Sequence, residues 1–147
     1  MQSLTRRALI TGLAVLPLAA CGRRRERRRD AKAARRSKRG EPPLYPNETP
    51  ELRRLINKYA DLYDVPRPLV HRVVIRESTH NPAARNGPYW GLMQILPQTA
   101  RTMGHRGSPE SLLDAETNLK YAVKYLRGAW LLSDGDHDTA VGWYARG

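Results

Sequence analysis

Two dense stretches of this 147-residue chain decide its fold: residues 77–84 read ESTHNPAA and residues 91–100 read GLMQILPQTA. Leu69, Val73 and Glu77 are spaced i, i+4, i+8, so they lie on one face of a helix predicted over residues 68–79. A carboxyl at the rim of an apolar face loses hydration, which favours its protonated form and raises its pKa. Glu77 therefore suits general acid chemistry. The alternative is that Glu77 pairs with an arginine at the helix end.

Helical periodicity also covers the residues around these two stretches. Thr49 predicts an N-cap with Pro50 at the first helical position, and Asp114 predicts the cap of a longer helix that ends near Gly135. Short helices are predicted over residues 97–103 and 138–145. No alternating strand of convincing length is present, so we expect a single all-α domain over residues 49–147.

These motifs resemble the lytic transglycosylase catalytic domain, the lysozyme-like module of the soluble-transglycosylase family. Residues 60–70 (ADLYDVPRPLV) are similar to the family's approach to its catalytic helix, and residues 77–84 to its Glu-Ser element followed by Asn-Pro and Ala. Residues 91–100 are very similar to its second signature. The resemblance covers roughly residues 51–147 and implies a lysozyme-like fold that acts on peptidoglycan glycan strands without a cofactor.

The resemblance also implies roles for individual residues. Glu77 would be the sole catalytic acid and base, and Ser78 would hydrogen-bond near the scissile sugar. Met93 and Gln94 would line the groove and contact the glycan, while Tyr144 would orient the Glu77 carboxyl. The third motif departs from the family's Ala-Tyr-Asn-Ala-Gly, because Ala145 and Arg146 follow Tyr144.

The positions of the carboxylates bear on the type of reaction. Glycosidases that use two carboxylates place them ~5–9.5 Å apart. No Asp or Glu occurs between Glu77 and Glu110, a region from which a hydrolase would often take the second one. We therefore expect cleavage of the MurNAc-GlcNAc β-1,4 bond with formation of a 1,6-anhydromuramoyl end. A muramidase that uses water and a catalytically weak peptidoglycan-binding protein remain as alternatives.

The N-terminal residues 1–20 have the order of a lipoprotein signal peptide. Arg6 and Arg7 precede an apolar run over residues 8–20, which is too short to span a bilayer as a helix. Residues 18–21 (LAAC) resemble a lipobox, so Cys21 is expected to be lipidated. The alternative is an unmodified thiol within a signal that is removed further along. A loose twin-arginine match leaves the export route open, and we expect a periplasm-facing lipoprotein on the outer or inner membrane.

A basic linker is predicted over residues 21–48. Eleven Lys or Arg and only two acidic residues fall within residues 23–39, whereas residues 41–147 carry thirteen basic and twelve acidic residues. A segment without large apolar residues cannot offset its ordering entropy, so we expect a disordered tether that could adhere to anionic membrane lipids. Because the pI of 10.5 comes from this arm, no nucleic-acid partner is expected.

The last expectations concern the C-terminal helix and the histidines. The domain is expected to be incomplete at its C-terminus, which would leave Tyr144 poorly positioned, and the protein is expected to be a monomer. Tyr89 and Trp90 are predicted either to stack on sugar rings or to pack in the core, and Trp130 and Trp143 to be core residues. The four histidines show no ligand spacing, so no metal site is expected.

Overall fold

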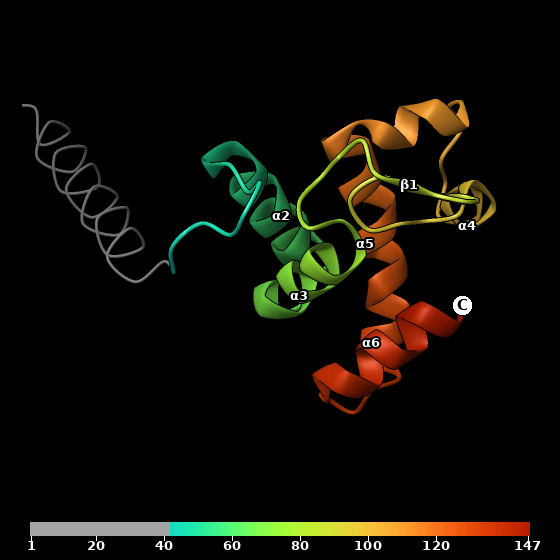
Figure 1. Ribbon diagram of the computed structural model, residues 1–147. Helices are drawn as coiled ribbons and strands as arrows, with labels where there is room; N and C mark the ends of the chain where they lie inside the picture. The colour runs from blue at the N-terminus through green and yellow to red at the C-terminus, as the bar shows by residue number, and fades with distance from the viewer. Residues whose placement is uncertain (1–41) are drawn as a thin grey trace, which may run out of the picture. The chain divides into compact units, whose positions relative to one another are not determined.

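A computed structural model describes residues 42–147 of the chain, and within them helices predominate (Figure 1). The signal peptide, Cys21 and the Arg-rich part of the linker lie outside the described residues. Within the described range no helix is long and apolar enough to cross a membrane. The helices are α2 (Pro50–Leu62), α3 (Arg67–Ser78), α4 (Pro97–Thr102), the 3-10 helix η1 (Pro109–Leu113), α5 (Ala115–Leu131) and α6 (His137–Arg146).

Side-chain caps fix where the helices begin. The Thr49 hydroxyl accepts a hydrogen bond from the Leu52 N–H at 3.1 Å, and Pro50 occupies the first turn of α2. The Asp114 carboxylate accepts from the Thr117 N–H at 2.7 Å at the start of α5. Each cap satisfies an N–H that has no partner within the helix. The two helix starts predicted at Thr49 and Asp114 are confirmed.

The core is built around α5, which contacts α2, α4, η1 and α6 and lies in the middle of the domain (Figure 1). Its inward face carries Leu119, Ala122, Val123 and Leu126, all with no exposed surface. The apolar face of α3 is equally buried through residues such as Leu69 and Val73. The helical fold predicted from the periodicity is confirmed.

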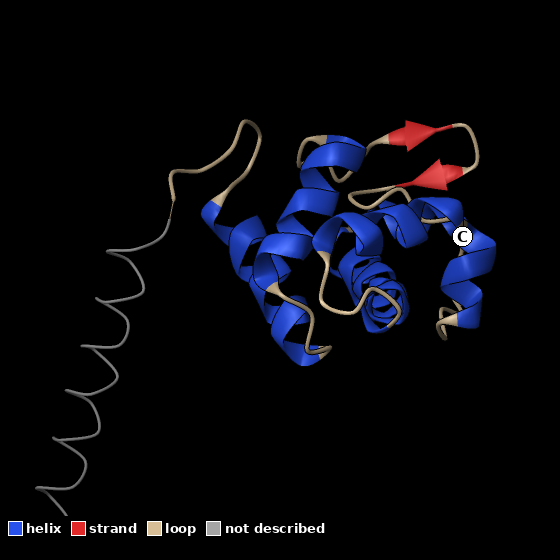
Figure 2. Cartoon of the chain, turned by 90° about the horizontal axis from the view of Figure 1, so that it is seen from below, coloured by secondary structure: helices blue, strands red, loops and turns tan. Residues whose placement is uncertain are grey.

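One short hairpin interrupts the helices. Strand β1 (Arg85–Asn86) pairs antiparallel with β2 (Tyr89–Trp90), and Figure 2 shows this hairpin at the edge of the helical body. Gly87 and Pro88 make the turn, with Gly87 at a φ of +56°. The segment that follows turns back, so that Trp90 and Ile95 form an isolated bridge. The hairpin thereby connects the two sequence motifs.

The tryptophans depart in part from the prediction. Trp143 is 42% exposed and lies under the Arg146 guanidinium at 4.7 Å, so its assignment to the core is wrong. Trp130 is only half-buried and meets the His137 ring edge-on. Trp90, in contrast, is buried, while Tyr89 is 42% exposed. Of the two predicted alternatives, Trp90 therefore follows the one of packing in the core, and Tyr89 lies at the surface, where stacking on a sugar ring is possible.

Candidate active site

Glu77 lies one residue before the end of α3, on a helix whose inward face is entirely apolar. The helix ends because Thr79 adopts a left-handed conformation with a φ of +50°, and its N–H donates to the Ile75 carbonyl. The side chain of Glu77 is 23% exposed and makes no hydrogen bond within the described chain. Its one charged neighbour in contact is Arg76, with the Nε atom 3.5 Å from Oε1.

The surroundings of Glu77 favour its neutral form. Partial burial raises the pKa of the Glu77 carboxyl above its usual range, and the Arg76 guanidinium lowers it by a smaller amount. The position near the C-terminal end of α3 acts in the same direction as burial, because the partial negative charge there disfavours a carboxylate. An acid with a raised pKa keeps a transferable proton nearer to neutral pH, as a general acid requires.

Opposite Glu77 lies the segment of residues 90–95, whose path is fixed by one buried side chain. The Asn118 amide of α5 donates to the Trp90 and Leu112 carbonyls, each at 2.9 Å, and its oxygen accepts from the Met93 N–H at 3.0 Å. Gly91 permits this arrangement. It has a φ of +73°, and a Cβ there would lie 2.3 Å from the Asn118 Nδ2 atom.

Two hydroxyls join this segment to the helices on either side. The Ser78 hydroxyl at the end of α3 donates to the Leu92 carbonyl at 2.8 Å. From α6, the Tyr144 hydroxyl donates to the Met93 carbonyl at 2.8 Å. Burial raises the pKa of Tyr144 far above its usual range, with a further contribution from the Glu77 charge, so Tyr144 is a neutral donor. These two hydrogen bonds attach the end of α3, which carries Glu77, and Tyr144 of α6 to the same loop.

A cleft of about 300 Å³ opens between these elements. Its lining consists of Arg76, Glu77, Asn86, Tyr89, Gln94, Tyr144 and Ala145. Glu77 is the only acidic residue among these described residues. A smaller hollow of about 100 Å³ continues the cleft past Tyr89, Gln94 and Tyr144 toward Thr99 and the end of α6. The arrangement is that of an open groove with a single carboxyl and an exposed aromatic ring.

The structure brings Glu77, Gln94 and Tyr144 together at this cleft. Two other predicted site residues, Ser78 and Met93, do not line it. The Met93 side chain has no exposed surface, so the expectation that it lines the groove is wrong. Its backbone, fixed between Asn118 and Tyr144, turns the side chain into the core. Ser78 directs its hydroxyl to the Leu92 carbonyl, and so it positions the loop beside Glu77.

Gln94 and Tyr144 line the cleft, but their side-chain donor groups already make hydrogen bonds within the protein. The Gln94 amide nitrogen donates to the Gly91 carbonyl at 2.8 Å and to the Ala84 carbonyl at 3.2 Å. Tyr144 is buried and gives its hydrogen to the Met93 carbonyl, so the expectation that it is poorly positioned is wrong. Its hydroxyl does not donate to the Glu77 carboxyl, so the expectation that it orients this carboxyl directly is also wrong. Its ring packs against Tyr125 of α5 at 5.4 Å, and this contact holds it in place.

The sequence patterns did not predict that Asn118 and Asn86 belong to the site. The role of Asn118 depends on carbonyls 28 and 6 residues away, which no local pattern shows. Asn86 reaches the cleft because β1 pairs with β2, and two-residue strands leave no periodic signal. A polar residue on the buried stripe of α5 was the available signal for Asn118.

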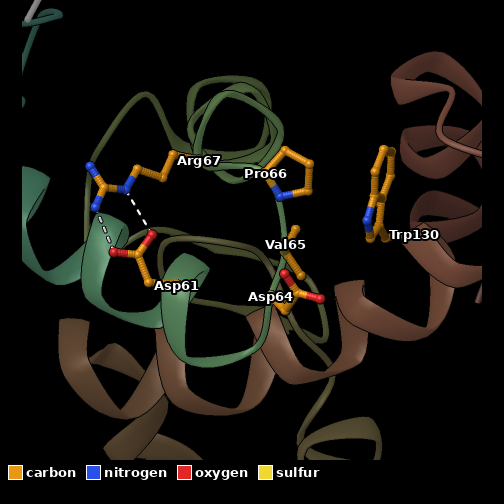
Figure 3. A pocket seen from close by; sticks show the side chains of 6 residues that line it. All are labelled: Asp61, Asp64, Val65, Pro66, Arg67 and Trp130. Atoms are coloured by element: carbon orange, nitrogen blue, oxygen red, sulfur yellow. Dashed lines mark hydrogen bonds and ion pairs between the residues drawn. The ribbon is translucent and has the colours of Figure 1, made fainter.

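A second hollow of about 500 Å³ lies between the α2–α3 turn and Trp130, away from Glu77 (Figure 3). Asp61 faces Arg67 on one side of it, with two hydrogen bonds at 2.8 and 2.5 Å. This pairing lowers the pKa of Asp61, so Asp61 is a poor proton donor. Asp64 is 91% exposed and loses little hydration. The larger hollow therefore lacks an acid suited to catalysis.

Comparison with protein families agrees with this geometry. The family model described as Transglycosylase SLT domain matches residues 54–147, which include α3, the hairpin, the segment of residues 90–95 and α6. No solved structure gives a significant match to the chain. The matched range contains Glu77 and every residue that lines the cleft. The chain therefore belongs to the transglycosylase SLT domain family, the peptidoglycan-degrading lytic transglycosylases of the lysozyme-like superfamily.

Proposed function

We propose that this protein cleaves the MurNAc-GlcNAc β-1,4 bond of peptidoglycan without water and leaves a 1,6-anhydromuramoyl end. The observation that carries the proposal is the lone carboxyl of Glu77 in the cleft, partly buried and without a second acidic residue in the lining. A hydrolase of the two-carboxylate type needs a nucleophile or a base opposite its acid. An intramolecular transfer needs neither, because the substrate supplies the nucleophile.

The reaction would have two proton transfers at one residue. Glu77 first gives its proton to the glycosidic oxygen, the C1–O bond breaks, and positive charge develops on the muramoyl ring. The Glu77 carboxylate then removes the proton from the C6 hydroxyl as O6 forms a bond to C1. The acid is regenerated, and no water enters the product. The raised pKa of Glu77 fits both steps, because it lies nearer to neutrality than that of an ordinary carboxyl.

Other cleft residues would place the glycan. Tyr89 projects 42% of its surface from the hairpin and can stack on a sugar ring. Asn86, its partner across the hairpin, offers an amide to sugar hydroxyls in the same cleft. Arg76 offers a cation beside Glu77 that can contact a carboxylate of the stem peptide. The groove would therefore recognise a peptidoglycan strand along both its sugars and its stem.

The test is the chemical nature of the released ends. Purified protein is incubated with isolated sacculi, and the soluble muropeptides are weighed by mass spectrometry before and after borohydride treatment. The expected product is lighter than a hydrolysed muropeptide by one water and is not reduced by borohydride, because an anhydro end is not a reducing sugar. Reducible MurNAc ends would establish a muramidase. Binding to sacculi without any soluble product would establish a wall-binding protein.

A further inference from the structure

A cluster of ligand-type side chains lies behind the catalytic helix, and the proposed reaction does not use it. Glu48 comes from the segment that precedes α2, His71 from α3, and His80 from the turn after α3. Suitable donor atoms of the three residues all lie within 4.8 Å of one another. The histidines show no ligand spacing in the sequence, but the structure brings His71 and His80 together beside Glu48. The left-handed Thr79 and His80, with φ values of +50° and +62°, fold the chain back against α3.

His80 is the member of the cluster whose ring nitrogens make no well-formed hydrogen bond within residues 42–147, although the ring approaches Glu48 and the backbone of Pro46. Its side chain has no exposed surface, and neither Nδ1 nor Nε2 makes a hydrogen bond in the described chain. Nε2 points to the Glu48 Oε1 atom from 3.9 Å. Burial lowers the pKa of His80, so the ring is neutral and one of its nitrogens carries a lone pair. A buried polar atom without a well-formed hydrogen bond destabilises the folded state, and a bound metal ion would offset that effect.

His71 is oriented as a metal-binding histidine usually is. Its Nε2 lies 3.0 Å from the Asn57 Oδ1 atom of α2, and since an amide oxygen only accepts, Nε2 carries the hydrogen. The lone pair of the neutral ring is then on Nδ1, which faces the Glu48 Oε1 atom at 3.6 Å. Burial lowers the pKa of His71 as well. A hydrogen bond that fixes the second ring nitrogen is typical of histidine ligands.

Glu48 supplies an oxygen between the two rings. The Arg53 guanidinium donates to Oε1 at 2.9 Å and to Oε2 at 2.6 Å, and the Tyr45 N–H donates to Oε2 at 2.9 Å. These bonds lower the pKa of Glu48 despite its burial, so the group is a carboxylate. Oε1 has a second lone pair and lies toward both imidazoles. The guanidinium fixes the carboxylate and also reduces its charge, so the site would bind more weakly than one without arginine.

We propose that Glu48, His71 and His80 bind one Zn²⁺ ion through Oε1, Nδ1 and Nε2. Two ligands in a tetrahedral zinc site are ~3.4 Å apart, given bonds of ~2.0–2.1 Å. The separations of 3.6 and 3.9 Å to Oε1 need to shorten slightly, and the two imidazole nitrogens, which lie within 4.8 Å of each other, must also reach this spacing. Two neutral imidazoles and a carboxylate form a set that suits zinc, with water in the fourth position.

The ion would join the segment before α2 to the end of the helix that carries Glu77. That contact already exists in a weaker form, because the Asn47 amide donates to the Thr79 carbonyl at 3.2 Å and the Tyr45 ring lies 6.0 Å from His80. His80 is three residues beyond Glu77 in the sequence. Zinc at this place would stabilise the turn that ends α3 and would take no part in the reaction itself.

The test is zinc binding by the full chain in a Cys21→Ser background, where the lone thiol cannot bind the metal. After treatment with a chelator, the protein is titrated with Zn²⁺ by calorimetry, and its melting temperature is followed. One ion per chain and a rise in melting temperature are expected. Co²⁺ should give the visible absorption of a four-coordinate site, lost on competition with Zn²⁺.

Variants distinguish this cluster from adventitious binding. His71→Ala and His80→Ala should each weaken zinc binding at least tenfold, and Asn57→Ala about tenfold through the orientation of His71. His137→Ala, outside the cluster, should bind as the parent does. If His80→Ala does not fold, the variants at the partly exposed His71 and at Asn57 still test the proposal. Equal affinity in all variants, or no binding by the parent, would overturn the proposal, whatever the protein does to peptidoglycan.

Discussion

Glu77 has two properties that follow from its place at the rim of α3, and both can be measured in one variant. We predict that Glu77→Gln lowers the rate of muropeptide release by ~10²–10⁴, because the amide keeps the shape but has no transferable proton. Because the folded state raises the pKa of Glu77, the charged form disfavours folding and this penalty grows as pH rises through that pKa. The neutral glutamine removes the penalty.

The unfolding midpoint of Glu77→Gln at neutral pH should therefore equal or exceed that of the parent. Glu110→Gln is the matched control, since Glu110 is exposed and does not line the cleft; it should retain full activity. Parental turnover by Glu77→Gln would show that another group donates the proton.

Arg76 controls the pH range of the same residue. Its guanidinium lowers the pKa of Glu77 against the larger effect of burial. The reaction begins with protonated Glu77, so activity is lost as pH rises through that pKa. Arg76→Ala should raise the pKa further and move the alkaline limb of the pH–rate profile to higher pH. Arg101→Ala, which changes the charge equally but lies away from the cleft, should leave the limb in place. A shift to lower pH would contradict this account.

Among the elements, the segment of residues 90–95 depends most on a single side chain. We predict that Asn118→Ala lowers the free energy of unfolding by about 2 kcal/mol or more, because it leaves the Met93 N–H and the Leu112 carbonyl buried without the partner that Asn118 supplies. The Trp90 carbonyl loses one of its two donors and keeps the Ile95 N–H at 3.1 Å. Chemical denaturation measures this change. Lys120→Ala, on the exposed face of the same helix, should have little effect. A loss below 1 kcal/mol would mean that the loop is held chiefly by packing.

Alanine substitutions at two glycines of the same region distinguish the effect of backbone strain on stability from the effect of a steric clash. Gly87 and Gly91 both have positive φ, so alanine at either position is unfavourable by about 1–2 kcal/mol. A Cβ at Gly87 would meet no atom within 4 Å, whereas at Gly91 it would meet two atoms at 2.3 Å, on Asn118 and Leu112. Gly91→Ala should therefore lose clearly more unfolding free energy than Gly87→Ala, together with activity. Equal losses would assign the whole effect to backbone conformation.

The comparison of these elements with the sequence shows which features are local. The caps at Thr49 and Asp114 and the position of Glu77 on α3 depend on residues within two turns, and the sequence predicted them. Met93 was misassigned because its direction is set by Asn118 and Tyr144, 25 and 51 residues away. The approach of His71 and His80 depends on left-handed residues that are not glycine, which no simple pattern indicates.

For the molecule as a whole, we propose that Cys21 carries a lipid and that the protein faces the periplasm from a membrane. The proposal rests on the lipobox-like residues 18–21 after a short apolar run. The protein should then partition into the detergent phase and incorporate a fatty-acid analogue, and Cys21→Ser should do neither. Acyl chains contribute ~0.8 kcal/mol per buried CH₂, so two or more anchor stably. An unlabelled parent protein would exclude lipidation.

The loop that faces Glu77 is held from three helices at once, since Ser78, Asn118 and Tyr144 each bind its main-chain atoms. A peptide fastened in this way is mechanically stiff. Under the proposed function, a glycan strand that binds beside this loop would meet a surface that resists displacement. Flattening of a pyranose ring toward an oxocarbenium geometry would then require the sugar, and not the loop, to change shape.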